Sequence, residues 1–189
     1  MTGSQQAPGT ETPRQNLGRA AVTPTLRPAV AADWAGVWPI WHRIVADGRT
    51  YSYPRDTDER TAEGLWMLPP PARVFVAELD DEAGRRTIVG SALLKPVQPG
   101  AGAHVANASF MIDPDQSGAG LGRALARHVL AEAEAEGYRA MQFNAVVETN
   151  RAAVRLWTSL GFEILTTVPE AFRHPEHGLV GLHVMHRRF

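Results

Sequence analysis

One stretch, residues 110–125, constrains the fold of this chain most: an apolar run, a turn, three alternate glycines and the start of a helix. Pro114 ends the apolar run, because proline has no N–H to donate to a sheet. Gly118, Gly120 and Gly122 have no Cβ, so the backbone between them can lie close against a ligand. Their N–H groups then point outward beside the positive end of the helix dipole. The stretch predicts a strand feeding a turn that suits a pyrophosphate.

Two better-known phosphate loops do not fit these glycines. A dinucleotide fingerprint, Gly-x-Gly-x-x-Gly, counted from Gly118 requires a glycine where the chain has Arg123. A Walker loop requires Lys and then Ser or Thr after Gly122, where the chain has Arg123 and Ala124. A glycine-rich turn with no ligand is the alternative at this point, so the rest of the chain must decide.

The composition excludes several classes of protein. The chain has 189 residues, 44% of them hydrophobic and 21% charged, which suits one domain with its own core. Its formal net charge is −1 and no Lys/Arg cluster stands out, so we expect no nucleic-acid partner. Without cysteine, it has no disulfide, thiolate metal site or thiol nucleophile. No segment approaches the roughly 20 apolar residues of a membrane span. Since no signal peptide stands out either, we expect a cytoplasmic protein with no membrane partner.

The hydrophobic pattern divides the chain into a tail and one domain. Residues 1–23 are rich in Thr, Gly, Ser, Gln and Pro, cannot offset their own ordering entropy, and are expected to be a disordered tail. Residues 24–189 are expected to form the domain. Its predicted strands are residues 25–30, 73–79, 87–95, 103–112, 139–147, 162–168 and 179–185. Its predicted helices are residues 34–45, capped by Asp33 and kinked at Pro39, then 56–67, the helix from the glycine turn to Gly137, and the helix from Asn150 to Gly161. This order favours an α/β domain with a mixed sheet.

Two segments together resemble a known family. The turn at residues 117–125, followed by Asn150-Arg-Ala-Ala-Val-Arg-Leu-Trp-Thr-Ser-Leu-Gly-Phe162, resembles the GCN5-related N-acetyltransferases (GNAT). The similarity in layout covers about residues 25–189. It implies the GNAT fold: an α/β domain whose mixed, mostly antiparallel sheet is splayed at its centre and flanked by helices. It also implies acetyl-CoA as co-substrate and possible homodimer formation through the C-terminal strands.

The resemblance also implies where the coenzyme lies. The N–H groups of the glycine turn would hold its pyrophosphate, the backbone near Met111 and Ile112 its pantetheine arm, and the Ile112 N–H the oxyanion. Asn150 would contact the arm, with a plain helix cap as its alternative. The full expected set is Met111, Ile112, Ser117, Gly118, Ala119, Gly120, Leu121, Gly122, Arg123, Asn150, Ala153 and Trp157.

Two of these positions depart from the family pattern. Ser117 stands where the family usually has Gln or Arg, with Gln116 one place early. Trp157 stands where many members have a tyrosine that protonates the departing thiolate, and indole cannot serve as that acid.

A narrower resemblance concerns the acceptor. Residues 104–110, 143–145 and 168–173 look like the azetidine-2-carboxylate/proline-analogue N-acetyltransferases. This implies that Asn107, Phe110 and Asn144 contact a free amino or imino acid, and we expect both asparagines and Ile112 to be catalytic. Since Asn107 and Phe110 face opposite ways in a regular strand, a shared pocket requires a bulge between them. The alternative is that the asparagines satisfy strand-edge backbone groups.

Other functions and catalytic groups stay open. Tyr51 and Tyr53 could wall off a small side chain, and their loop, residues 50–54, resembles phosphinothricin acetyltransferases, so such an acceptor is an alternative. A second alternative is a non-catalytic acyl-CoA-binding module, since no general base is obvious. The candidate bases are His104, Glu148 and His183. The spacings His174-x-x-His177 and His183-x-x-His186 suit metal ligands, but the second pair would face opposite sides of a strand, so we expect no metal.

Overall fold

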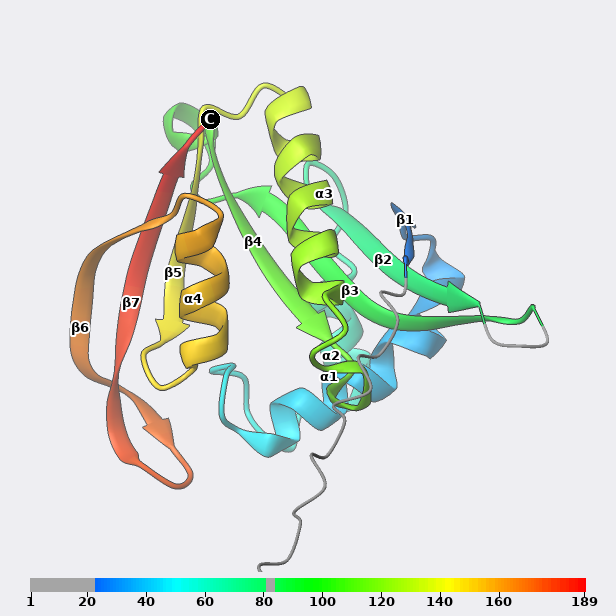
Figure 1. Cartoon of the computed structure of the whole chain (residues 1–189), viewed down its shortest axis with the longest axis horizontal. Coiled ribbons are helices and arrows are strands. Elements are labelled where there is room, and N and C mark those ends of the chain that lie inside the picture. Colours follow the sequence, from blue (N-terminus) through cyan, green and yellow to red (C-terminus); the bar gives the residue numbers. More distant parts are fainter. Residues whose placement is uncertain (1–22, 81–83) are drawn as a thin grey trace, which may run out of the picture.

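One mixed sheet organises the computed structural model, which describes residues 23–80 and 84–189 (Figure 1). Its seven strands lie in the order β1-β2-β3-β4-β5-β7-β6, and all neighbours are antiparallel except β4 and β5. The strands are β1 (Thr25–Pro28), β2 (Arg73–Asp80), β3 (Arg86–Pro96), β4 (Val105–Ile112), β5 (Ala140–Val147), β6 (Glu163–His174) and β7 (Gly178–Arg188). The helices are α1 (Trp34–Asp47), α2 (Glu59–Trp66), α3 (Leu121–Ala135) and α4 (Arg151–Ser159). The predicted GNAT-type α/β fold is confirmed.

The tail expected over residues 1–23 lies outside the described residues, apart from its last residue. Within the described part of the chain, no helix is both long and apolar enough to cross a membrane.

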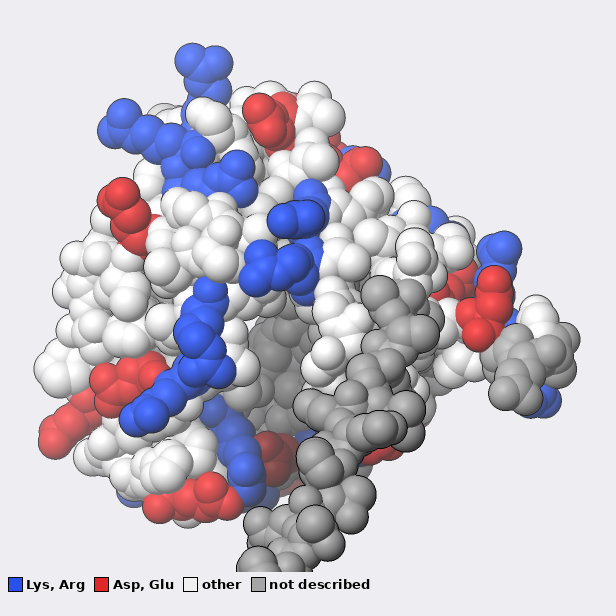
Figure 2. Space-filling model, in the orientation of Figure 1, with Lys and Arg blue, Asp and Glu red and all other residues white. Residues whose placement is uncertain are grey.

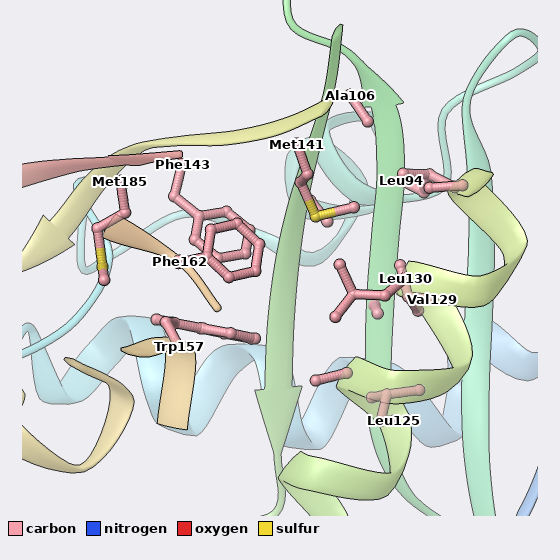
Figure 3. Packing of buried hydrophobic residues seen from close by; sticks show 14 of the residues in the cluster. Leu94, Ala106, Leu125, Val129, Leu130, Met141, Phe143, Trp157, Phe162 and Met185 are labelled. Carbon is pink, nitrogen blue, oxygen red and sulfur yellow. The ribbon is translucent and has the colours of Figure 1, made fainter. Parts of the chain in front are cut away.

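Helices cover both faces of the sheet, as Figure 1 shows. Alternate residues of β4 point to opposite faces: Ala106 and Ala108 pack with α3, whereas Met111 packs with α1 and α2. Figure 3 shows Leu125 and Val129 of α3 on the first face. These two apolar layers fix the helices on either side of the central strands.

The sheet opens between β4 and β5. These two parallel strands pair only at Val105↔Ala140 and Ala106↔Met141. Beyond that point each strand continues with its outer partner, β4 with β3 as far as Ile112 and β5 with β7 as far as Val147. The predicted splay at the centre of the sheet is therefore present.

The prediction of a bulge in β4 is wrong: the cavity reaches both faces of the sheet at the open edge of β4, so Asn107 and Phe110 both line it without a bulge. From Ala106 to Ile112, β4 pairs with β3 without a register shift. The shift lies across the gap, in β5, where Phe143 and Val146 pair with residues only two apart in β7. This bulge returns Val146 to the face of Phe143, where both are buried, and leaves Asn144 exposed.

Several element ends differ from the prediction for identifiable reasons. Asp33 does not cap α1, because its carboxylate pairs with Arg27 and accepts from the Val30 N–H. Asp58 caps α2, which begins later than expected. Pro39 lies inside a continuous α1.

The segment between the last two predicted strands, residues 169–178, is mostly strand. β6 continues to His174 because an irregularity after Val168 accommodates Pro169 and the positive φ of Glu170, 54°.

Candidate active site

A cavity of about 1140 Å³ occupies the gap between β4 and β5. Figure 2 shows this face hollowed between α3 and α4, and the cavity lining includes the basic side chains of Arg43 and Arg123. The cavity brings together every predicted site residue except Ala119, which packs beside Ala77 and Val89. Residues far apart in the sequence therefore form one site: Tyr51, Tyr53, Asn107, Phe110, Met111, Ile112, Ser117, Gly118, Gly120, Leu121, Gly122, Arg123, Asn144, Asn150, Ala153 and Trp157.

The glycine turn presents a row of backbone donors. Gly118 and Gly120 have φ angles of 85° and 80°, in the left-handed region that favours glycine. The first helical bond of α3 runs from the Ala124 N–H to the Gly120 carbonyl. The N–H groups of residues 118–123 have no hydrogen-bond partner among the residues that the structure describes. They are available to an anion at the positive end of α3.

The free edge of β4 faces the cavity. Asp113 donates its N–H to the Val89 carbonyl in β3, at 2.8 Å. Because pairing alternates along antiparallel strands, the N–H groups of Phe110 and Ile112 point away from β3, into the gap. The backbone groups of Met111 point towards β3 instead. Of the two residues expected to pair with a pantetheine arm, only Ile112 presents its own N–H to the cavity.

The structure confirms that Asn150 caps a helix. Its side-chain oxygen accepts from the Ala153 N–H at 3.1 Å, at the start of α4. Both residues line the cavity, so a contact with the coenzyme arm is compatible with the cap and stays a prediction.

Trp157 joins the two sides of the gap. It is only 7% exposed, and its ring centroid lies 4.9 Å from that of Phe110 in β4 and 4.6 Å from that of Phe143 in β5. Phe162 stacks on Phe143 at 4.4 Å. Figure 3 shows Trp157, Phe143 and Phe162 gathered on the α4 side of the core. This aromatic cluster closes one wall of the cavity but supplies no acid, since the indole N–H does not dissociate to protonate a thiolate.

Asn107 and Asn144 are linked across the gap by hydrogen bonds to one residue, Gln142. Asn107 follows the last β4–β5 pair, and its Nδ2 donates to the Gln142 carbonyl at 2.8 Å. The Gln142 side chain donates from Nε2 to Oδ1 of Asn144, also at 2.8 Å. One half of the Asn107 amide thus satisfies a strand-edge carbonyl, as the structural alternative holds. Sequence analysis missed Gln142, although its position two residues before Asn144 on one strand was a usable signal.

Two tyrosines form the wall opposite the aromatic cluster. The Tyr51 hydroxyl donates to the Phe110 carbonyl at 2.9 Å, and the Tyr51 and Tyr53 rings stack 5.8 Å apart. Burial raises the pKa of Tyr51 well above its usual range, and burial also raises the pKa of Tyr53. Both hydroxyls therefore stay protonated at neutral pH, as hydrogen-bonding groups and not as bases.

None of the three candidate bases lines the cavity. Oε1 of Glu148 accepts from the Gly181 N–H at 2.6 Å. Nδ1 of His183 pairs with the Thr167 hydroxyl at 2.7 Å, and Nδ1 of His104 lies 3.1 Å from the Ala101 carbonyl. These side chains serve strand and loop contacts, which favours a structural role for each of the three.

His174 and His177 make contacts within their own loop. Nδ1 of His174 accepts from the N–H groups of Glu176 and His177, and the His174 and His177 rings stack 4.5 Å apart. Over residues 23–80 and 84–189, no three His, Asp or Glu side chains are grouped to hold a metal ion.

Comparison with known proteins identifies the family. The chain belongs to the acetyltransferase (GNAT) family, because the model of that family matches residues 38–162, more than half of the chain. This match includes the glycine turn and the segment from Asn150 to Phe162.

Three similar proteins show how far the likeness extends. The N-acetyltransferase aca1 of Schizosaccharomyces pombe is 31% identical over 106 residues, 56% of this chain and 51% of that protein, so the chain spans about half the length of this curated relative. The structure of a GCN5-related N-acetyltransferase from Kribbella flavida is 50% identical, with a TM-score of 0.82, over 88% of this chain and 98% of that chain. The structure of yncA from Salmonella typhimurium, solved with its cofactor acetyl-CoA, is 25% identical, with a TM-score of 0.71, over 88% of this chain and 94% of that chain.

Proposed function

We propose that the protein transfers an acetyl group from acetyl-CoA to the amine of a small molecule, with a free amino or imino acid as the leading acceptor. One observation carries this proposal. A single cavity joins the unpartnered N–H groups of residues 118–123 to Asn107 and Asn144, with the Ile112 N–H between them. A donor molecule with a phosphate and an acceptor with polar groups can therefore meet there.

The coenzyme end of the cavity works through the backbone. Acetyl-CoA supplies the acetyl group as an activated thioester. The N–H groups of residues 118–123 would bind its pyrophosphate, and the free edge of β4 at Phe110 and Ile112 would pair with its amide-containing arm. The Ile112 N–H would stabilise the negative charge that develops on the carbonyl oxygen.

The acceptor end works through side chains. Asn107 and Asn144 can bind a zwitterion without adding charge, while Tyr51, Tyr53 and Phe110 enclose a small apolar side chain. An α-amine is mostly protonated at neutral pH. Because no predicted base lines the cavity, the acceptor would lose its proton to water before attack.

The direct test measures free-thiol release from acetyl-CoA with free amino acids, proline analogues, phosphinothricin and polyamines as acceptors. Turnover of one amino or imino acid supports the leading proposal. Turnover of phosphinothricin or a polyamine alone would replace it with the small-amine alternative.

A second candidate is the non-catalytic acyl-CoA-binding module, favoured by Trp157 and by the placement of the three candidate bases outside the cavity. Calorimetry on the same protein separates it: tight binding of acetyl-CoA with no thiol release above blank hydrolysis supports a binding module and sinks the transferase proposal.

We also propose homodimer formation through the C-terminal strands. β6 is an edge strand, and its Leu165 and Val168 side chains are 58% and 47% exposed. Such an edge invites pairing with another strand. Sedimentation should show a dimer that Leu165→Lys dissociates; a wild-type protein that stays monomeric at high concentration contradicts the proposal.

A further inference from the structure

Gln142 of β5 contacts both asparagines of the acceptor end. Its backbone carbonyl accepts from Nδ2 of Asn107, and its side-chain Nε2 donates to Oδ1 of Asn144. Gln142 itself does not line the cavity. It therefore acts on an acceptor only through the two side chains that it holds.

The two bonds leave opposite ends of the two amides available. A backbone carbonyl can only accept, so Asn107 must turn its Nδ2 towards Gln142, which leaves its Oδ1 as a free acceptor. Asn144 uses its Oδ1 for the Gln142 side chain, which leaves its Nδ2 with N–H groups to donate. One cavity wall thus offers one acceptor and one donor.

Asn144 needs this external restraint because of where it lies. It sits in the β5 bulge, between the paired residues Phe143 and Val146, and it is exposed. The regular ladder does not fix the backbone there. In the structure, the bond from Gln142 occupies Oδ1 of Asn144 and leaves Nδ2 as the end of that amide that can face the acceptor.

We propose that Gln142 is a positioning residue that orients the Asn144 amide and so selects acceptors that carry both an amine and a carboxylate. Nδ2 of Asn144 donates to the carboxylate, and Oδ1 of Asn107 accepts from the amine, whose lone pair stays free for attack. This inference rests on the proposed acetyl transfer to a free amino or imino acid.

Gln142→Glu tests the proposal, because a carboxylate can only accept. Asn144 must then turn its Nδ2 towards position 142 and present Oδ1 to the cavity. The ratio of kcat/KM for an amino acid to that for its α-amide should fall about tenfold or more, since hydrogen bonds to charged groups are the stronger ones. Acetyl-CoA affinity should not change. Gln142→Lys keeps a donor at this position and should keep the wild-type preference.

A double-mutant cycle separates orientation from charge, since the new carboxylate also repels an anionic acceptor. If Gln142 acts through Asn144, adding Gln142→Glu to Asn144→Ala should leave the selectivity ratio of the single Asn144→Ala variant unchanged. If Gln142→Glu lowers the ratio equally in both backgrounds, the effect is repulsion alone and the positioning role is overturned.

A measurement without an acceptor distinguishes this inference from the proposed function. In NMR spectra of the protein alone, the side-chain NH₂ signals of Asn144, assigned with Asn144→Ala, should move downfield in Gln142→Glu, while those of Asn107 stay in place. Unmoved Asn144 signals overturn the positioning role even if amino acids are acetylated. Moved signals in a protein that acetylates no amino acid leave the positioning intact and overturn the proposed acceptor.

Discussion

In the proposed function, the two ends of the cavity would recognise their partners by different means. The coenzyme end presents backbone N–H groups, held by the left-handed turn at Gly118 and Gly120 and by the open edge of β4. The acceptor end presents side chains, held by hydrogen bonds among Asn107, Gln142 and Asn144. Backbone recognition tolerates many side chains, whereas side-chain recognition changes with one substitution. This difference would allow one fold to keep acetyl-CoA as the acetyl donor while the acetyl acceptor varies.

The largest effect is expected from removing Trp157, the residue that joins the two sides of the gap in which both ends of the cavity lie. Trp157→Ala deletes a buried ring that contacts Phe110 and Phe143, so the free energy of unfolding should fall by about 3–5 kcal/mol. Urea denaturation measures it, and the half-buried Trp38→Ala serves as control with a smaller loss. A loss below about 1 kcal/mol would show that the two sides of the gap are held by other contacts.

Removal of a side chain that would bind the acetyl acceptor should lower the activity without changing the affinity for acetyl-CoA. Asn144→Ala deletes a donor at the exposed β5 bulge, so kcat/KM for the preferred amino acid should fall about 10–100-fold. The dissociation constant of acetyl-CoA, measured by calorimetry, should stay within error. An equal loss of coenzyme affinity would contradict the separation of the two ends.

Strain in the glycine turn should act on the other end. A Cβ at Gly120 meets no atom within 4 Å, so Gly120→Ala acts through its φ of 80° alone and should cost about 1–2 kcal/mol of stability. As the turn relaxes, its N–H groups move and acetyl-CoA affinity should fall about tenfold.

The matched control is Gly64→Ala in α2, where a Cβ also meets nothing and φ is not positive. There the substitution should stabilise the helix slightly. If both variants bind acetyl-CoA as the wild type does, the turn does not hold the pyrophosphate.

The pH profile gives the mildest test of the acceptor end. Because burial raises the pKa of both Tyr51 and Tyr53, these hydroxyls stay protonated up to their ordinary pKa of about 10 and beyond. The rate should therefore rise with pH as the acceptor amine loses its proton, with no fall from tyrosine ionisation below about pH 10. The midpoint should move when the acceptor is changed. A midpoint near pH 6.5 that ignores the acceptor would indicate a protein histidine as the base.

The sequence predicts the local structure of the proposed coenzyme end far better than that of the proposed acceptor end, and the reason is physical. Gly118 and Gly120 signal a left-handed backbone because other residues adopt it at a cost. Asn150 signals a helix start because its side chain satisfies a free N–H. These signals are local, so a single sequence contains them.

The acceptor end depends on relations that no local pattern encodes. The β5 bulge sets where Asn144 points, and it arises from pairing with a strand some 40 residues later in the chain. His183 is a candidate base in the sequence, yet its ring pairs with Thr167 and does not line the cavity. The position of a strand in the sheet predicts neither the direction of a given side chain nor its hydrogen-bond partner.

The short paired segment between β4 and β5 has a consequence for the local opening of the sheet. Strand pairs join β4 to β5 only at Val105↔Ala140 and Ala106↔Met141, beside single hydrogen bonds from the Arg139 N–H to the His104 carbonyl and from Nδ2 of Asn107 to the Gln142 carbonyl, so that edge lacks most of a ladder. A ligand arm lying along Phe110 and Ile112 would act as a missing strand between them. Its binding should slow hydrogen exchange at these amides and raise the melting temperature, because the ligand stabilises only the folded state. The substrate would then serve as a structural member of the fold that acts on it.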